Sequence, residues 1–365
     1  MEDSGNSAVA GGLFITLYDE ETLKLYLNKG IYGFLMRPEN KDVPTAQSKY
    51  FSVLADYACS REGTDVFFFI KRKIYYGGKI YGNKDSGSFY VNGLNSPLGR
   101  KLNANLFWDE TPRYKPAKKP GVFFVKDTEK AQPFIFQFYS NENTGKYIIS
   151  DDLYFNLGKK YPYPLPSNSM QGLSFCTLTP GEVKELLNLL HNSKNKLDYS
   201  KCVGIEKKGE ETLFSEGLVN ISDELINEAQ LEFTILSSLA PLADFLSDDY
   251  ILCRQVPISP FKPMNMDRAD ICLYSIKNQI KNGTIPNVII ELKKDKTGAN
   301  KKAYEQVVRY LKWVESITEK DEFTKVRAFI ISPEFTKIKR DKVDLKYESK
   351  ITMICTKTKK IIELQ

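Results

Sequence analysis

The sequence predicts an α/β (α+β) protein with two domains, a β-rich one over residues 13–191 and an α/β one over residues 221–365, joined by a linker at 192–220. Three observations predict this division. Short apolar runs separated by turn residues fill the first segment, as in β-structure. A polar stretch, residues 192–208, interrupts this pattern. After it the elements follow the order α-β-β-β-α-β, which is typical of helices packed against a mixed sheet.

In the N-terminal segment we expect helices at 19–28 and 49–60 and a turn at Gly77-Gly78. The clearest element is a helix at 179–190, because a Thr cap precedes a Pro at the first helical position and leucines repeat along one face. Strands are expected at 65–70, 79–81, 122–126, 134–139 and 146–149.

In the C-terminal segment the pattern begins with a long amphipathic helix at 222–247, for which Ser222 and Asp223 are candidate caps. A helix is also expected at 299–318. Strands are expected at 250–258, 267–274, 287–293, 325–331 and 351–355.

The composition restricts the chemistry more than it restricts the partners. A net charge of +6 permits a polyanionic partner but does not require one. The single histidine, His191, excludes hydrolytic sites built from several histidines, including HNH and multi-histidine zinc sites. Chemistry in this chain therefore depends on carboxylates, lysines and a hard metal ion.

Several features indicate a cytoplasmic protein without a membrane segment. No apolar run approaches the roughly 20 residues that a membrane-spanning helix needs. The first dozen residues lack the basic start and apolar centre of a secretory signal. None of the six cysteines forms a C-x-x-C pair, which favours reduced thiols. The absence of a G-x-x-x-x-G-K-[ST] motif argues against ATP as a partner.

The strongest chemical signal is a buried strand that ends in an acid and a base. Residues 287–293 form an apolar run that contains Glu291 and Lys293, and strand alternation places these two side chains on one face. The preceding strand carries Asp270, which we expect beside Glu291. Two carboxylates and a backbone carbonyl such as that of Leu292 form an oxygen-rich site suited to Mg²⁺ or Mn²⁺.

Two helices offer further groups. The upstream helix carries Glu228 and Glu232 one turn apart, and either could supply a third carboxylate, with Glu232 preferred. The downstream helix places Gln306 and Tyr310 one turn apart.

In this order the residues resemble the PD-(D/E)XK nuclease superfamily, in particular its NucS-type and RecB-like branch. The resemblance covers about residues 225–331 and includes a Leu-Glu helix, an Arg-Gln-Val strand, an Asp-Arg-x-Asp strand, a Glu-x-Lys strand and a Gln-x-x-x-Tyr helix. Two departures are Ala269, where the superfamily often has Pro, and the 20 residues that separate Asp270 from Glu291.

The resemblance implies a DNA endonuclease in which Asp270, Glu291 and Glu232 bind one or two Mg²⁺ ions. Lys293 would orient or deprotonate the attacking water or stabilise the transition state, and Gln306 and Tyr310 would position the Lys–Glu pair or contact the phosphate. Basic residues near the site are candidates for gripping the nucleic-acid backbone. They are Lys294, Lys296, Lys301, Lys302 and Arg268.

The N-terminal segment looks like the PUA-like group that includes EVE and YTH readers of modified bases. The resemblance rests on a helix, a Gly-x-Asp-Val-Phe-Phe-Phe strand and a Gly-Gly-Lys-Ile strand. It implies that aromatic side chains enclose a base, for which Trp108, Phe34 and Tyr32 are candidates. Core packing is the alternative role for each of these aromatic residues.

Three functions remain open on this evidence. The first is a Mg²⁺-dependent restriction or defence endonuclease that acts on double-stranded DNA, directed by its N-terminal domain and possible as a homodimer. The second is a repair nuclease for mismatched or branched DNA. The third is a nucleic-acid-binding protein with an inactive nuclease fold. A separate alternative for the residues themselves is that Glu291 and Lys293 form only a salt bridge at a strand end.

Overall fold

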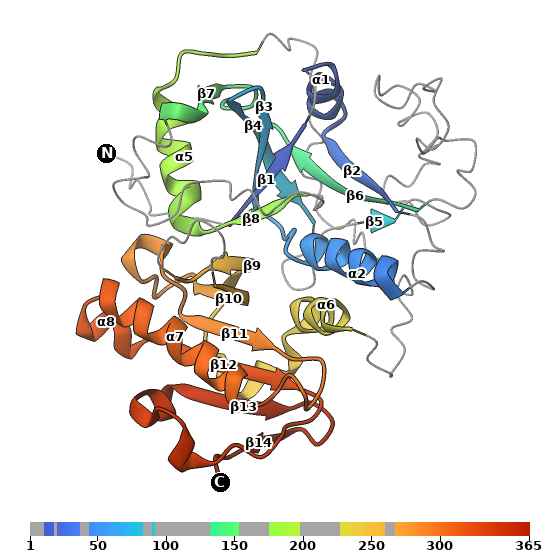
Figure 1. The fold of residues 1–365 in the computed structure, drawn as a ribbon. Helices are drawn as coiled ribbons and strands as arrows, with labels where there is room; N and C mark the ends of the chain where they lie inside the picture. Colours follow the sequence, from blue (N-terminus) through green and yellow to red (C-terminus); the bar gives the residue numbers. More distant parts are fainter. Residues whose placement is uncertain are drawn as a thin grey trace.

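The computed structural model describes residues 11–17, 20–36, 44–82, 90–91, 132–152, 175–197, 227–259 and 267–365. Within these residues the chain is a mixed α/β protein with two mixed sheets, one in each half of the sequence (Figure 1). The predicted fold class is confirmed at this level.

The N-terminal sheet has the strand order β2-β6-β4-β3-β1-β8, with β5 paired to β6 and β7 paired to β4. Its β1 and β3 strands are parallel and the remaining pairs are antiparallel. The strands are β1 (Gly12–Thr16), β2 (Ile31–Met36), β3 (Asp65–Ile70), β4 (Lys73–Tyr81), β5 (Tyr90–Val91), β6 (Gln132–Tyr139), β7 (Tyr147–Ile149) and β8 (Cys176–Leu178). The strand expected at 122–126 lies outside the described residues.

Three helices accompany this sheet, namely α1 (Glu20–Lys29), α2 (Pro44–Ala58) and α5 (Pro180–Asn192). The start of α5 follows the prediction, because Thr179 and Glu182 form a reciprocal capping box. The helix expected at 49–60 begins earlier, at Pro44, a residue that is well suited to a first helical turn.

The turn expected at Gly77-Gly78 is wrong, because both glycines lie inside β4. Gly78 has a φ of +153°, and a β-carbon there would collide with the carbonyl oxygen of Tyr139. A β-carbon on Gly77 would come within 2.6 Å of the Phe68 ring. These glycines therefore allow close approach of neighbouring strands rather than a chain reversal.

The C-terminal sheet has the order β14-β13-β12-β11-β10-β9, in which β11, β12 and β13 are parallel neighbours. Its elements contain the predicted order α-β-β-β-α-β, with one unpredicted short helix at 320–324 before the last strand of that series. They are α6 (Glu228–Ser238), β9 (Tyr250–Pro257), β10 (Arg268–Ser275), β11 (Val288–Leu292), α7 (Lys301–Ile317), α8 (Lys320–Thr324), β12 (Arg327–Ser332), β13 (Ile351–Cys355) and β14 (Lys360–Ile362). Short 3₁₀ turns occur at Ala240–Phe245, Lys281–Gly283, Arg340–Lys342 and Leu345–Lys350.

The helix expected at 222–247 is shorter than predicted. Asn227 caps α6, and the proposed caps Ser222 and Asp223 lie outside the described residues. The helix ends at Ser238, and the next residue, Leu239, adopts a left-handed conformation with a φ of 52°. Pro241 follows, and its ring cannot continue an α-helix, so the chain turns into a 3₁₀ segment instead.

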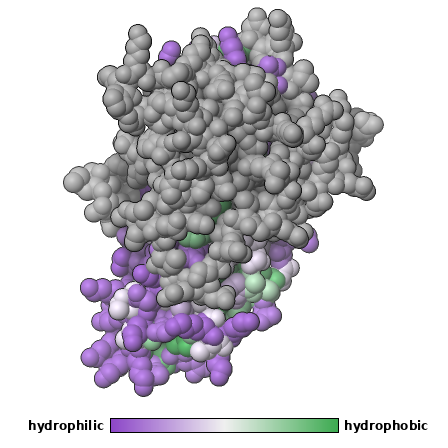
Figure 2. Space-filling view, turned by 90° about the vertical axis from the view of Figure 1, so that its right-hand side faces the viewer, coloured by the Kyte–Doolittle hydropathy of each residue, from purple (hydrophilic) through white to green (hydrophobic). Residues whose placement is uncertain are grey.

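The C-terminal sheet is covered by α6 on one face and α7 on the other. One cluster of buried residues joins α6 to one sheet face through Leu231, Ile235, Ile271, Ile290 and Phe329. A second cluster joins α7 to the opposite face through Cys272, Ile289, Val307, Leu311 and Ile330. The outward side of this half visible in Figure 2 is mostly hydrophilic.

The first of these clusters continues into the N-terminal half, where it includes Val53 and Tyr57 of α2. Helices α2 and α6 lie side by side between the two sheets (Figure 1). The two halves therefore share one hydrophobic core. Among the described residues, no helix is long and apolar enough to cross a membrane, and the five cysteines are buried and unpaired.

Candidate active site

Asp270 and Glu291 meet where β10 and β11 separate. The antiparallel ladder ends at the pair Ile271–Ile290, so Asp270 and Glu291 stand at the next position outward. The amide of Leu292 donates to Asp270 Oδ2 at 2.7 Å, so a side chain replaces a backbone acceptor there. The structure thus brings the two carboxylates together at a strand end, as their alternation predicts.

Glu291 is held at both oxygens. The ammonium of Lys293 pairs with its Oε1, and the hydroxyl of Tyr310 lies 3.1 Å from its Oε2. That hydroxyl also lies 2.6 Å from the carbonyl oxygen of Arg268 and accepts from Gln306 Nε2 at 2.6 Å. The predicted Lys–Glu pair and the predicted Gln–Tyr pair therefore form one network on the α7 side of the sheet.

Burial and crowding of like charges shift the acid–base properties of this network. Burial raises the pKa of Asp270 well above its ordinary value, and the charges of Glu291 and Glu232 raise it further. Burial also raises the pKa of Glu291, although Lys293 offsets part of the rise. Burial alone would lower the pKa of Lys293, but the charges of Glu291 and Asp270 produce a net rise. Burial and like charges thus disfavour the ionised form of both carboxyls, and a bound cation would relieve this effect.

Glu232 occupies a different environment. It is buried, and its two oxygens accept from Arg254 Nε at 2.9 Å and Nη2 at 2.6 Å, a bidentate ion pair. Gln255 Nε2 lies 3.4 Å from Glu232 Oε1 and 3.2 Å from Asp270 Oδ1, and so bridges the two acids. Glu232 is therefore next to the site but already paired.

Glu228, the alternative third carboxylate, is exposed at the first turn of α6. Within the described part of the chain it has no hydrogen-bond or ion-pair partner. Its charge adds to the rise in the pKa of Lys293 that Glu291 and Asp270 produce, which places it near the Lys–Glu pair. By this geometry Glu228 is more available to a cation than Glu232.

The donor set fits a hard divalent cation in type and in charge. Among the described residues, the acids Asp270 and Glu291 stand beside one ammonium, that of Lys293, so their like charges repel. A divalent ion would offset them and relieve the crowding at Asp270. In the present side-chain arrangement no three acids, cysteines or histidines of the described segments converge as a finished cage, so the carboxylates would have to turn toward the ion.

The lysines predicted to grip nucleic acid lie beside the site. Lys294, Lys296, Lys301 and Lys302 are all exposed in the connection between β11 and α7 or at the start of α7. A turn in this connection is closed by Asp295, and a β-carbon on Gly298 would come within 3.0 Å of the Lys293 side chain. Arg268 is only half-exposed, and its carbonyl group faces Tyr310.

The aromatic candidates for base recognition are Tyr32, Phe34 and Trp108, and the structure describes the side chain of the first. Tyr32 is buried, with Tyr26 and Phe136 both 5.3 Å from its ring centre, so the prediction that it contacts a base is wrong. A strand residue in the middle of an aromatic core packs against its neighbours instead. Phe34 belongs to β2 but its side chain lies outside what is described, as does the whole of Trp108.

Sequence reasoning missed two residues that join this site to the rest of the molecule. Arg254 was part of a motif but had no assigned role, and Asp56, 198 residues earlier, is its second partner. One signal was available, because an arginine inside an otherwise apolar strand needs a buried carboxylate. The identity of that carboxylate depends on the packing of α2, which no local pattern reveals.

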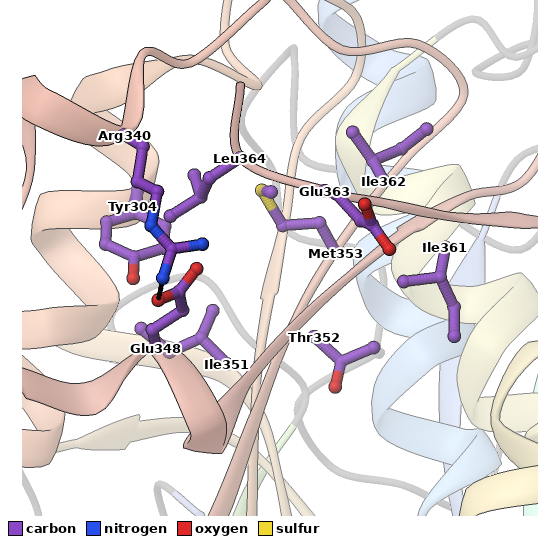
Figure 3. A pocket seen from close by; sticks show the side chains of 10 residues that line it. All are labelled: Tyr304, Arg340, Glu348, Ile351, Thr352, Met353, Ile361, Ile362, Glu363 and Leu364. Atoms are coloured by element: carbon purple, nitrogen blue, oxygen red, sulfur yellow. Dashed lines mark hydrogen bonds and ion pairs between the residues drawn. The ribbon is translucent and has the colours of Figure 1, made fainter. Parts of the chain in front are cut away.

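A separate hollow of about 400 Å³ is lined by residues of α7, β13 and β14 (Figure 3). An ion pair between Arg340 and Glu348 forms part of its wall. Its lining contains none of the candidate catalytic residues and consists of Tyr304, Arg340, Glu348, Ile351, Thr352, Met353, Ile361, Ile362, Glu363 and Leu364.

Comparison with protein-family models, with curated proteins and with solved structures finds no match for this chain. The functional conclusion therefore depends on the geometry of the site and on the motif pattern of the sequence.

Proposed function

We propose that the C-terminal half is a Mg²⁺-dependent endodeoxyribonuclease of the PD-(D/E)XK type, which hydrolyses phosphodiester bonds and also accepts Mn²⁺. The observation that carries this proposal is the position of Asp270 and Glu291 at the separating ends of β10 and β11, with Lys293 paired to Glu291. A structural salt bridge requires one acid and one base. Here a second acid, Asp270, lies beside the Lys293–Glu291 pair at a desolvated strand end, which is typical of functional sites.

Each residue has a role that its contacts support. Asp270 and Glu291 bind the cation, with Glu228 or Glu232 as a further ligand, directly or through water, and the Leu292 carbonyl as a backbone ligand. The bound ion would supply an acidified water and offset charge on the phosphate. Lys293 orients the water and stabilises the charge that develops on the phosphoryl oxygens. Tyr310 and Gln306 hold Glu291 in place.

The partner we propose is double-stranded DNA, held by the exposed lysines between β11 and α7. The N-terminal half would then direct cleavage, as a PUA-like reader of a modified base in a restriction or defence enzyme. Trp108 and Phe34 remain candidates for contact with that base. Cleavage of both strands would require two copies of the chain, since one site cuts one strand.

A panel of duplexes tests this function. Plain, methylated, hydroxymethylated, mismatched and flapped DNA are incubated with the full chain and Mg²⁺, and products are resolved on denaturing gels. We expect cleavage that depends on Mg²⁺ or Mn²⁺ and is lost in Asp270→Ala and Glu291→Ala, while DNA binding persists. Lys312→Ala, which removes one partner of an exposed ion pair, is the matched control and should cut normally. Undiminished cutting in excess EDTA would contradict the proposal.

The same panel separates two alternatives. Preference for mismatched or flapped DNA would indicate a repair nuclease. A binding protein without catalysis is the second alternative, and it is favoured by one observation, the engagement of both Glu232 oxygens by Arg254. Binding without cutting under every metal condition would support it.

A further inference from the structure

The guanidinium of Arg254 is shared between the two halves of the molecule. On the side of α6 it forms the bidentate pair with Glu232. On the side of α2 its Nη1 pairs with Asp56 and donates to the Ser52 carbonyl oxygen at 3.0 Å, and its Nη2 reaches Ser52 Oγ at 3.2 Å. The Arg254 and Asp56 side chains are only 4% and 1% exposed, so little solvent screens their charges.

The contact between α2 and α6 fixes this arrangement. The Phe51 and Phe233 rings pack with centres 6.4 Å apart, and Arg61, which follows α2, donates to the carbonyl oxygen of Leu236 at 3.0 Å. Both helices contribute to one core, and Arg254 joins Asp56 of one helix to Glu232 of the other.

A second connection leads from this pair to the cation site. Gln255 follows Arg254 in β9 and has a φ of 52°, which is strained for a residue with a side chain. Its amide bridges Glu232 and Asp270. A continuous line of contacts therefore runs from Asp56 through Arg254, Glu232 and Gln255 to Asp270.

We propose that Asp56, in the N-terminal half, is a positioning residue for the cation-binding carboxylates and acts through Arg254. Asp56 takes up part of the charge of Arg254, which would otherwise fall on Glu232 alone. Removing the Asp56 charge binds Glu232 more firmly to Arg254, makes the region around Asp270 less negative and weakens cation binding. The site is thus complete only when both halves are present. This inference rests on the proposed function of the C-terminal half.

Titration of the full chain with Mn²⁺, followed by electron paramagnetic resonance of the free ion, tests the inference without any DNA. We expect Asp56→Asn to raise the dissociation constant for Mn²⁺ by roughly tenfold, as is usual when a residue behind a metal ligand is lost. Asp56→Glu keeps the charge and should restore most of the affinity. Asp65→Asn is the matched control, since Asp65 is a buried acid paired with Lys79 instead. Its affinity should stay within about twofold of wild type.

A double variant distinguishes an effect of Asp56 that is transmitted through Glu232 from an effect caused only by the loss of one negative charge. In a Glu232→Gln background, Asp56→Asn should change the Mn²⁺ affinity by less than half as much on a logarithmic scale. A folded Asp56→Asn protein with wild-type affinity would overturn the inference alone, whereas a wild-type chain that binds no Mn²⁺ would overturn the proposed function. If thermal melting shows Asp56→Asn unfolded, Ser52→Ala replaces it, with an expected two- to threefold loss and the same overturning result.

Discussion

Two ion pairs flank Asp270, and they differ in how far they are open to solvent. The Lys293 side chain is 17% exposed and, within the described part of the chain, pairs with one acid, Glu291. The Arg254 side chain is 4% exposed and is enclosed by two acidic partners from two helices. A lysine with spare hydrogen-bonding capacity at an open edge can act on a substrate, whereas an arginine with every face engaged can only hold its neighbours. This difference is the basis for proposing a chemical role for Lys293 and a positioning role for Arg254.

Replacing each cation by methionine gives the largest expected contrast. Lys293→Met should leave the fold intact and reduce cleavage on the order of 10²- to 10³-fold. Arg254→Met strands two buried carboxylates and should lower the free energy of unfolding by about 3–5 kcal/mol. Urea denaturation and gel-based cleavage assays measure the two effects.

The exposed pair of Lys312 and Asp344 provides the control for this contrast. Lys312→Met should change the free energy of unfolding by less than about 1 kcal/mol. The distinction between the solvent-accessible Lys293 pair and the enclosed Arg254 pairs fails if Arg254→Met has the same free energy of unfolding as Lys312→Met.

A smaller effect concerns stability in the absence of metal. The raised pKa values of Asp270 and Glu291 mean that the folded chain keeps these protons to a higher pH than the unfolded chain. Without metal, the stability that these two protonated carboxyls contribute is present in full at pH values below the ordinary carboxyl pKa. It is lost as the pH rises through their raised pKa values. Asp270→Asn should remove part of this loss and raise the neutral-pH melting temperature by roughly 2 °C.

Calorimetry with and without Mn²⁺ across roughly pH 4–8 checks this expectation. Added Mn²⁺ should stabilise the wild type at high pH and leave Asp270→Asn unchanged. A melting temperature of the metal-free wild type that increases steadily with pH would contradict the assignment of raised pKa values.

The smallest effect is expected beside the open pair. Lys294→Ala and Lys296→Ala should each reduce the slope of log affinity for DNA against log salt by about 0.9. Fluorescence anisotropy with a labelled duplex measures this slope. Lys320, which is exposed on α8, serves as the control. Equal slopes in all four proteins would place the DNA on another surface.

Much of the C-terminal fold could be predicted because its strands follow simple alternation. Glu291 and Lys293 share a face because they are two residues apart in a strand. The position of Asp270 beside Glu291 follows once the two strands pair as antiparallel neighbours. The Gln306–Tyr310 contact follows from helical periodicity. These relations are local or involve adjacent strands, so a single sequence contains them.

What could not be predicted depends on packing between distant segments. Tyr32 looks like an exposed aromatic beside glycines, yet several rings from other elements surround it. The glycines of β4 look like a turn, yet they accommodate neighbouring strands. The preference for Glu232 over Glu228 overlooked Arg254, whose partner in α2 is set by tertiary contact.

The shared core between α2 and α6 has a consequence for evolution and engineering. Proteins that change their target by exchanging whole domains depend on a domain interface with few residue-specific contacts. Here a graft of a foreign N-terminal half would have to supply both a matching apolar helix and an acid at the place of Asp56. Replacement of the N-terminal half as a unit is therefore expected to disrupt the shared core unless the graft keeps both of these features.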